Sequence, residues 1–169
     1  MDLGSYERLG RRLRGRELAA VTAALAADPA VRARARHDPE QRWYTKLHAT
    51  EWFEVWLLGW DVEQRTELHD HGGSSGAFSV CAGTLSELHT EGAGGRLGHR
   101  VHPPGTTRSL GPAYVHDLSN RGPGVAARVH AYSPPLRLMN YYGFDQTGGL
   151  TVTRTEDVTV PEQGGVLVG

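Results

Sequence analysis

Two histidines separated by one residue, His69 and His71, have the spacing in this sequence that best suits metal chemistry. In a β-strand, residues two apart point to the same face, so both imidazoles can reach one ion while Asp70 turns the other way. A third ligand must come from elsewhere in the chain. His116 starts another strand-like segment after a Gly-Pro turn, and it is the candidate.

Three neutral imidazoles suit more than one metal. On an octahedral Fe(II) they would leave three open positions, which a reaction between two bound substrates requires. The same three ligands could hold Zn(II) tetrahedrally with one water, as in a hydrolase or a hydratase. A bare His-x-His pair also occurs by chance on protein surfaces. The imidazoles alone therefore leave the metal open.

The segments around these histidines predict a small, mainly β fold that follows a helical start. Residues 6–27 carry apolar side chains at spacings of three to five, which indicates an amphipathic helix, and residues 31–36 form a second short helical stretch. Residues 52–60, 77–80 and 125–132 have the aromatic, branched or alternating composition of strands. Glycine and proline clusters separate these segments, so the pattern favours a barrel or jelly roll with two helices covering one side.

The length of the chain fits one domain. We expect a helical segment at residues 1–40, a barrel at 41–155 and a tail at 156–169, with a last strand starting near residue 151.

Composition narrows the possible partners. The 18 lysines and arginines nearly balance the 19 aspartates and glutamates, so no charged field is available to hold a nucleic acid. No apolar stretch approaches the roughly 20 residues that cross a bilayer, and no secretion signal is indicated. The single cysteine, Cys81, excludes an internal disulfide, which agrees with a reducing cytoplasm. We expect a cytoplasmic monomer with a small-molecule substrate.

Three segments resemble the cysteine dioxygenase branch of the cupin superfamily. They are residues 44–46 (YTK), 69–85 (HDHGGSSGAFSVCAGTL) and 128–135 (RVHAYSPP). The likeness extends over about residues 40–145, and chance agreement of all three segments in this order is improbable. The resemblance implies a small cupin, a jelly-roll-like β-barrel, with two N-terminal helices.

The resemblance also implies the residues of the site. By this likeness His69, His71 and His116 hold an Fe(II) cofactor, and His130 and Tyr132 form the catalytic pair beside it. His130 and Tyr132 share a strand face by the period-two rule, so the imidazole could orient the phenol toward the metal.

The implied reaction adds both atoms of O₂ to the sulfur of a small thiol and gives a sulfinate, with L-cysteine as the default substrate. A dioxygenase for another thiol (ergothioneine, 3-mercaptopropionate or cysteamine) is the first alternative. A zinc or nickel cupin acting as hydrolase or isomerase is the second. That class needs a general base near the metal, and Asp70 should face away.

Three positions depart from the family. Mammalian members cross-link a cysteine to the active-site tyrosine, but this chain has Gly76 at that place, and we expect Cys81 to be a small buried residue with no thioether. Lys46 replaces the arginine that binds the substrate carboxylate, and it lacks the bidentate fork. Arg128 replaces a serine, on the same strand face as His130, and it could take over the anion-binding duty or pair behind the barrel wall. Lys46 and Arg128 are therefore the candidate substrate-binding residues.

The remaining histidines have no partner at ligand spacing. We expect them to be solvated surface residues without a role. They are His37, His48, His89, His99 and His102.

Overall fold

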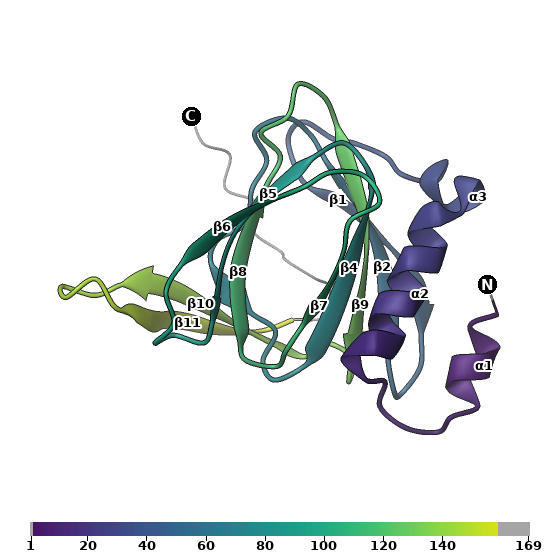
Figure 1. Ribbon diagram of the computed structural model, residues 1–169, viewed down its shortest axis with the longest axis horizontal. Coiled ribbons are helices and arrows are strands. Elements are labelled where there is room, and N and C mark those ends of the chain that lie inside the picture. Colours follow the sequence, from purple (N-terminus) through teal and green to yellow (C-terminus); the bar gives the residue numbers. More distant parts are fainter. Residues whose placement is uncertain (1, 159–169) are drawn as a thin grey trace.

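The computed structural model describes residues 2–158 and confirms a mainly β fold. Two antiparallel sheets face each other, and the helices pack against one of them (Figure 1). The first sheet has the order β1 (Trp43–Ala49), β2 (Glu54–Trp60), β9 (Ala126–Ser133), β4 (Ser75–Ala82) and β7 (Thr107–Leu110). The second has the order β11 (Leu150–Asp157), β10 (Leu138–Phe144), β3 (His69–Asp70), β8 (Tyr114–Ser119), β5 (Leu85–Glu91) and β6 (Gly98–His102).

The helical start differs from its prediction. The single helix predicted over residues 6–27 is two helices, α1 (Gly4–Glu7) and α2 (Gly15–Ala27), because Gly10 between them adopts a left-handed φ of +58°. The stretch predicted at residues 31–36 is instead α3 (Pro29–Arg32). Its start is fixed by the carboxylate of Asp28, which accepts from the Ala30 N–H at 2.8 Å.

Helix α2 covers the outer face of the first sheet. It lies against β4, β7 and β9 and buries an apolar stripe that includes Leu18, Val21 and Leu25. The outer face beneath it is apolar too, with Val55, Leu57 and Val129 in the same cluster. Since side chains alternate along a strand, the neighbours of these residues point between the two sheets.

The predicted strands are present with shifted ends. The segments predicted at residues 52–60 and 125–132 are β2 and β9, and residues 77–80 lie inside β4. The last predicted strand is β11, and residues 159–169 of the predicted tail lie outside the described residues. Of the described helices, none has the length and apolar character needed to cross a membrane.

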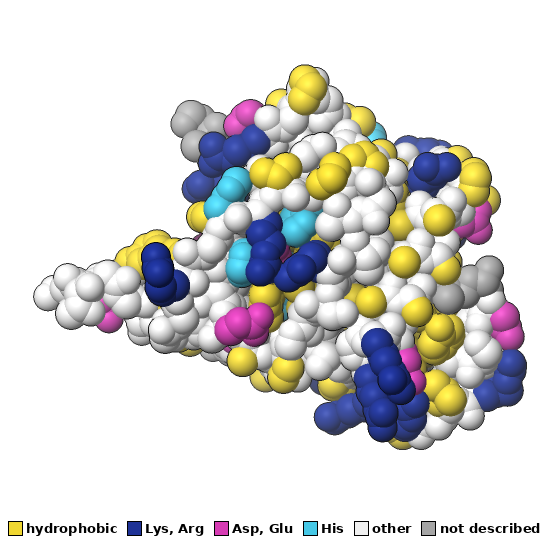
Figure 2. Space-filling model, viewed as in Figure 1, with side chains coloured by type: hydrophobic (Ala, Val, Ile, Leu, Met, Phe, Trp, Pro, Cys, Tyr) yellow, Lys and Arg dark blue, Asp and Glu magenta, His cyan; other side chains and the backbone are white. Residues whose placement is uncertain are grey.

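The space between the sheets is lined by aromatic side chains. Trp60, Phe78, Tyr114, Tyr132 and Tyr141 are all buried in one inner cluster. Histidines from both sheets lie among these rings. Figure 2 shows histidine, lysine and arginine side chains gathered at the end of this space that faces the viewer.

Candidate metal centre

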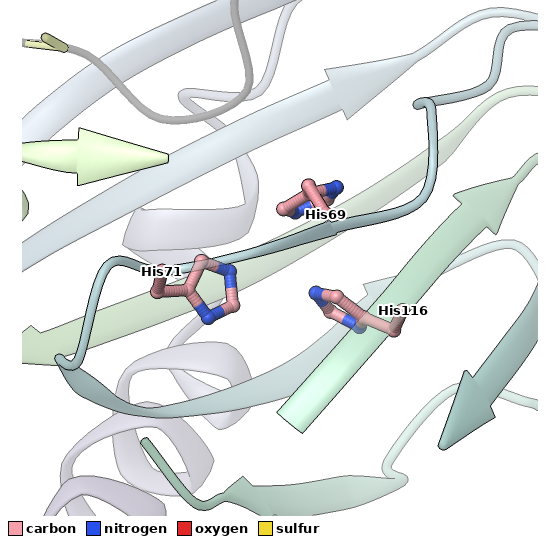
Figure 3. Close-up of side chains that lie close together, drawn as sticks. All are labelled: His69, His71 and His116. Atoms are coloured by element: carbon pink, nitrogen blue, oxygen red, sulfur yellow. The ribbon is translucent and has the colours of Figure 1, made fainter. Parts of the chain in front are cut away.

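The three predicted ligands converge between the sheets (Figure 3). His69 of β3 and His116 of β8 are direct cross-strand partners, and His71 follows two residues after His69. The ring centroids of the three imidazoles lie 4.8 to 5.2 Å apart, and one nitrogen from each lies within 4.8 Å of the others. All three side chains are buried. The structure therefore brings together the residues that the strand period and the family resemblance selected.

Two of the imidazoles are oriented by their Nδ1 atoms. The Nδ1 atom of His69 lies 2.8 Å from the backbone oxygen of Glu67, and that of His116 lies 2.9 Å from Oε1 of Glu87. Since an oxygen acceptor of this kind requires a proton on Nδ1, each ring is set in the tautomer whose Nε2 lone pair is available to a metal. The donor set fits a divalent cation that accepts neutral nitrogen ligands.

The carboxylate of Glu87 belongs to a buried network that includes one of the other histidines. Its second oxygen, Oε2, lies 2.8 Å from Nε2 of His102. Burial raises the pKa of Glu87, but the hydrogen bonds with His102 and His116 outweigh it and hold that pKa well below its ordinary value. Glu87 is therefore an ionised carboxylate directly behind a candidate ligand.

Asp70 has the opposite orientation from its two histidine neighbours, as predicted. Its carboxylate accepts from Asn140 Nδ2 at 2.9 Å, from the Tyr142 hydroxyl at 2.7 Å and from the Gly72 N–H at 2.8 Å. These contacts occupy both oxygens on the side of the sheet away from the triad. Asp70 thus braces the turn that carries His71.

The His130–Tyr132 pair lies on the opposite sheet and faces the triad. A hydrogen bond of 3.1 Å joins the Tyr132 hydroxyl to Nδ1 of His130, and both side chains are fully buried. The Tyr132 and His130 ring centroids lie 4.9 and 5.4 Å from that of His71. The pair predicted from the period of β9 is therefore formed, and its two rings lie beside the ring of His71.

Cys81 lies on the other side of the first sheet from Tyr132. Gly76 is the β4 residue paired with Tyr132, and Cys81 packs in the outer cluster beneath α2. Burial raises the pKa of the Cys81 thiol to about 11. The prediction that Cys81 is a small buried residue is confirmed, and the wall of the sheet separates its sulfur from the tyrosine ring.

Lys46 lies at the open edge of the first sheet, where β1 is the terminal strand. It is 42% exposed at its side chain, its Nζ is 3.3 Å from Oε2 of Glu54, and it lies 4.6 Å from the Trp56 ring centroid. Lys46, Trp56 and His130 occupy one row across β1, β2 and β9, so the lysine is on the inner face but two strands from the His130–Tyr132 pair. Its role in binding substrate stays a prediction.

Arg128 is fully buried and points between the sheets, on the same face as His130 and Tyr132. Its guanidinium carbon lies 5.3 Å from the Trp60 ring centroid and 5.4 Å from that of Phe78. Of the two orientations left open by the sequence, the structure selects the inner one. A second buried arginine, Arg42, lies 4.7 Å from Trp60 and was not singled out by the sequence.

The expectation of five solvated histidines is correct only in part. His37 and His99 are exposed, but His48 is half-buried with Nε2 2.8 Å from Oε1 of Glu7, and His89 is half-buried and stacked on Tyr114. The expectation is wrong for His102, which is buried.

His102 and Glu87 are the functional candidates that sequence reasoning missed. Each sits at an inward position of a strand, but only the pairing of β5 with both β6 and β8 brings them to His116. No local spacing signals this arrangement, because the three residues are 14 or more positions apart in the chain.

A family model described as cysteine dioxygenase type I matches residues 11–146. The search of curated proteins gave no match.

Solved structures with a similar fold include a member of the cupin superfamily. Protein TT1209 from Thermus thermophilus has 18% identity and a TM-score of 0.54, covering 62% of this chain and 93% of that one. A recombinant oxalate oxidase in complex with glycolate has 19% identity and a TM-score of 0.55, covering 64% and 60%. A sugar phosphate isomerase of the cupin superfamily from Silicibacter pomeroyi has 18% identity and a TM-score of 0.52, covering 68% and 78%. At these identities the likeness shows the fold alone, and it confirms the predicted cupin class.

Proposed function

Since this chain belongs to the cysteine dioxygenase type I family, we propose that it is an iron-dependent thiol dioxygenase that converts a small thiol and O₂ to a sulfinate. The observation that carries the proposal is the buried triad His69, His71 and His116, which lies against the His130–Tyr132 pair inside a chain matched by this family. L-cysteine is the default substrate.

The donor set supports iron in the role of the metal. Fe(II) bound by three neutral imidazoles would supply adjacent coordination positions at which a thiolate and dioxygen can react. In the overall reaction the sulfur loses four electrons and O₂ gains them, while both oxygen atoms end on sulfur. No external reductant is needed.

The protein residues would orient the reactants and exclude water. Tyr132, held by its hydrogen bond to His130, presents a hydroxyl beside His71 and would donate to the oxygen or sulfur atoms that develop charge. The buried aromatic lining of the inner cluster would limit the access of water, and electrostatic interactions are stronger where water is excluded.

A different thiol is the main alternative, and specific residues favour it. Lys46 is paired with Glu54 at the edge of the sheet, so it offers a substrate carboxylate only a shared point charge. Arg128 meanwhile brings a buried guanidinium to the inner face. A larger thiol whose carboxylate extends to Arg128, such as ergothioneine, would use this cation. The carboxylate of 3-mercaptopropionate is as far from its sulfur as that of L-cysteine, and cysteamine has no carboxylate to offer.

A zinc or nickel hydrolase or isomerase finds less support. Such an enzyme needs a carboxylate or other base that can reach substrate. Among the described residues, Asp70 is bonded on the far side of its strand, and both oxygens of Glu87 are held by histidines. Neither carboxylate is available as a general base.

The experiment that tests the proposal combines metal analysis with turnover. Protein purified anaerobically with Fe(II) is offered L-cysteine, 3-mercaptopropionate, cysteamine and ergothioneine in ¹⁸O₂, and oxygen uptake and products are measured. We expect uptake with at least one thiol and a sulfinate carrying two ¹⁸O atoms. A product with one labelled oxygen, or no uptake with any thiol by fully iron-loaded protein, would contradict the proposal.

A further inference from the structure

Glu87 connects a candidate metal ligand to a second histidine through its two carboxylate oxygens. Oε1 lies 2.9 Å from Nδ1 of His116, and Oε2 lies 2.8 Å from Nε2 of His102. The side chains of Glu87 and His116 have no exposed surface, and that of His102 has 3%. The three groups thus form a chain of two short hydrogen bonds that is sealed from solvent.

Burying the Glu87 carboxylate costs hydration free energy, so its contact with His116 calls for a functional explanation. An ionised group buried between sheets loses its hydration, and an apolar residue of similar size often fills such a place with no loss of stability. Glu87 lies on the inner face of β5, with the buried Leu85 two residues before it. Its cross-strand partner Leu118 is two residues from His116 on β8, so the carboxylate lies diagonally beside the ligand.

The partners of the candidate ligands are not equivalent. Nδ1 of His69 contacts a neutral backbone oxygen, that of Glu67, whereas Nδ1 of His116 contacts a charged carboxylate. A carboxylate behind a ligating imidazole fixes its tautomer and raises its basicity more than a neutral acceptor does. His116 should therefore be a stronger donor than His69.

We infer that Glu87 is a positioning residue of the metal centre, which sets the orientation and donor strength of His116, and that His102 keeps the Glu87 carboxylate from rotating. This inference rests on the proposed metal site, but not on which thiol is the substrate. It assigns a role to two buried residues that make no contact with the substrate in the proposed reaction.

The test measures metal binding rather than turnover. Glu87→Gln keeps the size of the side chain and removes its charge. In the full chain, titrated anaerobically with Fe(II) and with Co(II) against a competing chelator, we expect affinity to fall about 10- to 100-fold. The Co(II) absorption bands should also shift, because the field of one ligand changes, while circular dichroism and the melting temperature of the metal-free protein report folding.

Asp117→Asn is the matched control. Asp117 follows His116 on β8 and is half-buried, and its carboxylate accepts from the Leu88 N–H rather than from a histidine. Removing this charge should leave metal affinity and the Co(II) spectrum unchanged. An equal loss in both variants would mean that net charge near the site matters and not the contact to His116, and this would overturn the inference.

A second variant guards against misfolding of the first. His102→Gln retains an amide donor for Oε2 of Glu87, and we expect a smaller loss of affinity, about two- to tenfold, at the low end of the range for partners of metal ligands. A folded Glu87→Gln protein that binds both metals as tightly as the wild type, with the same spectrum, would overturn the inference and leave the proposed function intact. A wild-type chain that binds neither metal would overturn the metal site itself.

Discussion

His69 and His116 are direct cross-strand partners, and among the described residues theirs is the one register pair that joins β3 to β8, with ring centroids 4.8 Å apart. Both residues of β3 also pair with β10. Because the register of a strand decides which face each side chain takes, this pair fixes two ligands of the candidate centre at once. Loss of either histidine should therefore remove metal without removing the fold.

His116→Ala should lose iron and activity together. Wild-type protein prepared with Fe(II) should hold close to one iron per chain, and the variant should hold about a tenth of that or less after gel filtration, since two imidazoles hold a divalent cation weakly. Plasma emission analysis gives the metal content. His99→Ala, at an exposed position of β6, is the control and should keep its iron. Full iron in the His116 variant would refute the ligand assignment.

Tyr132→Phe should separate metal binding from turnover. The phenol hydroxyl is hydrogen-bonded to Nδ1 of His130, and Tyr132 is not a member of the candidate ligand group, so iron content should be unchanged. Turnover should fall by about one to three orders of magnitude, the usual loss for a positioned donor. Steady-state oxygen uptake by iron-matched samples measures this. Unchanged turnover would reduce Tyr132 to a packing residue.

Cys81 should be a free and protected thiol. Intact mass should equal the sequence mass, since the first sheet separates Cys81 from Tyr132 and no thioether can form. Because burial raises the thiol pKa to about 11, little thiolate exists near neutral pH, and native protein should resist iodoacetamide until the pH nears that pKa or denaturant is added. Rapid labelling of native protein near neutral pH, or a mass lower by two hydrogens, would contradict the structure.

Lys46→Ala should raise the Michaelis constant about tenfold for a thiol that carries a carboxylate, the scale of one lost charged hydrogen bond. The same substitution should leave the Michaelis constant for cysteamine nearly unchanged, because cysteamine has no carboxylate. Lys46→Arg introduces a guanidinium that can bind a carboxylate through two hydrogen bonds, and it should lower the Michaelis constant for L-cysteine below the wild-type value. Glu54→Gln serves as the control for breaking the Lys46–Glu54 ion pair alone. If Lys46→Ala leaves the constant for L-cysteine unchanged, Lys46 does not bind the substrate.

Arg128→Ser, which introduces the residue usual in the family, should shift the preference toward L-cysteine. The buried guanidinium beside Trp60 and Phe78 occupies space and offers charge on the inner face, and serine removes both. The ratio of kcat/KM for L-cysteine to that for ergothioneine and 3-mercaptopropionate measures the shift. Arg121→Ser, at an exposed arginine, should leave the ratio unchanged. An unaltered ratio in folded Arg128→Ser protein would remove Arg128 from substrate selection.

Much of the site was predictable because its signals are local. His130 and Tyr132 are two residues apart within β9, and the alternation of a strand places them on one face. His71 comes directly after the two-residue strand β3, and the extended chain there puts it on the same side as His69. His116 was a candidate because it starts a strand-like segment after a Gly-Pro turn, and the family resemblance then grouped it with the first pair. The mainly β fold followed in the same way from short apolar segments between glycine and proline clusters.

Other features depend on contacts that the sequence does not display. The apolar residues between 6 and 27 recur at helical spacing, and this continuous pattern predicted one helix. The low helix propensity of Gly10 was not enough to predict the break that the structure shows there. Whether Arg128 points inward was set by the pairing of β9 between β2 and β4.

The sequence by itself determined which histidines could share a metal, because strand period and family motif are both written along the chain. Only the tertiary structure decided which residues contact the Nδ1 atoms of these histidines. Glu87, His102 and His116 belong to three strands, β5, β6 and β8, whose registers are fixed by packing across the whole sheet. A carboxylate becomes the partner of a ligand only when those registers bring it within 2.9 Å, and sequence distance carries no record of that approach.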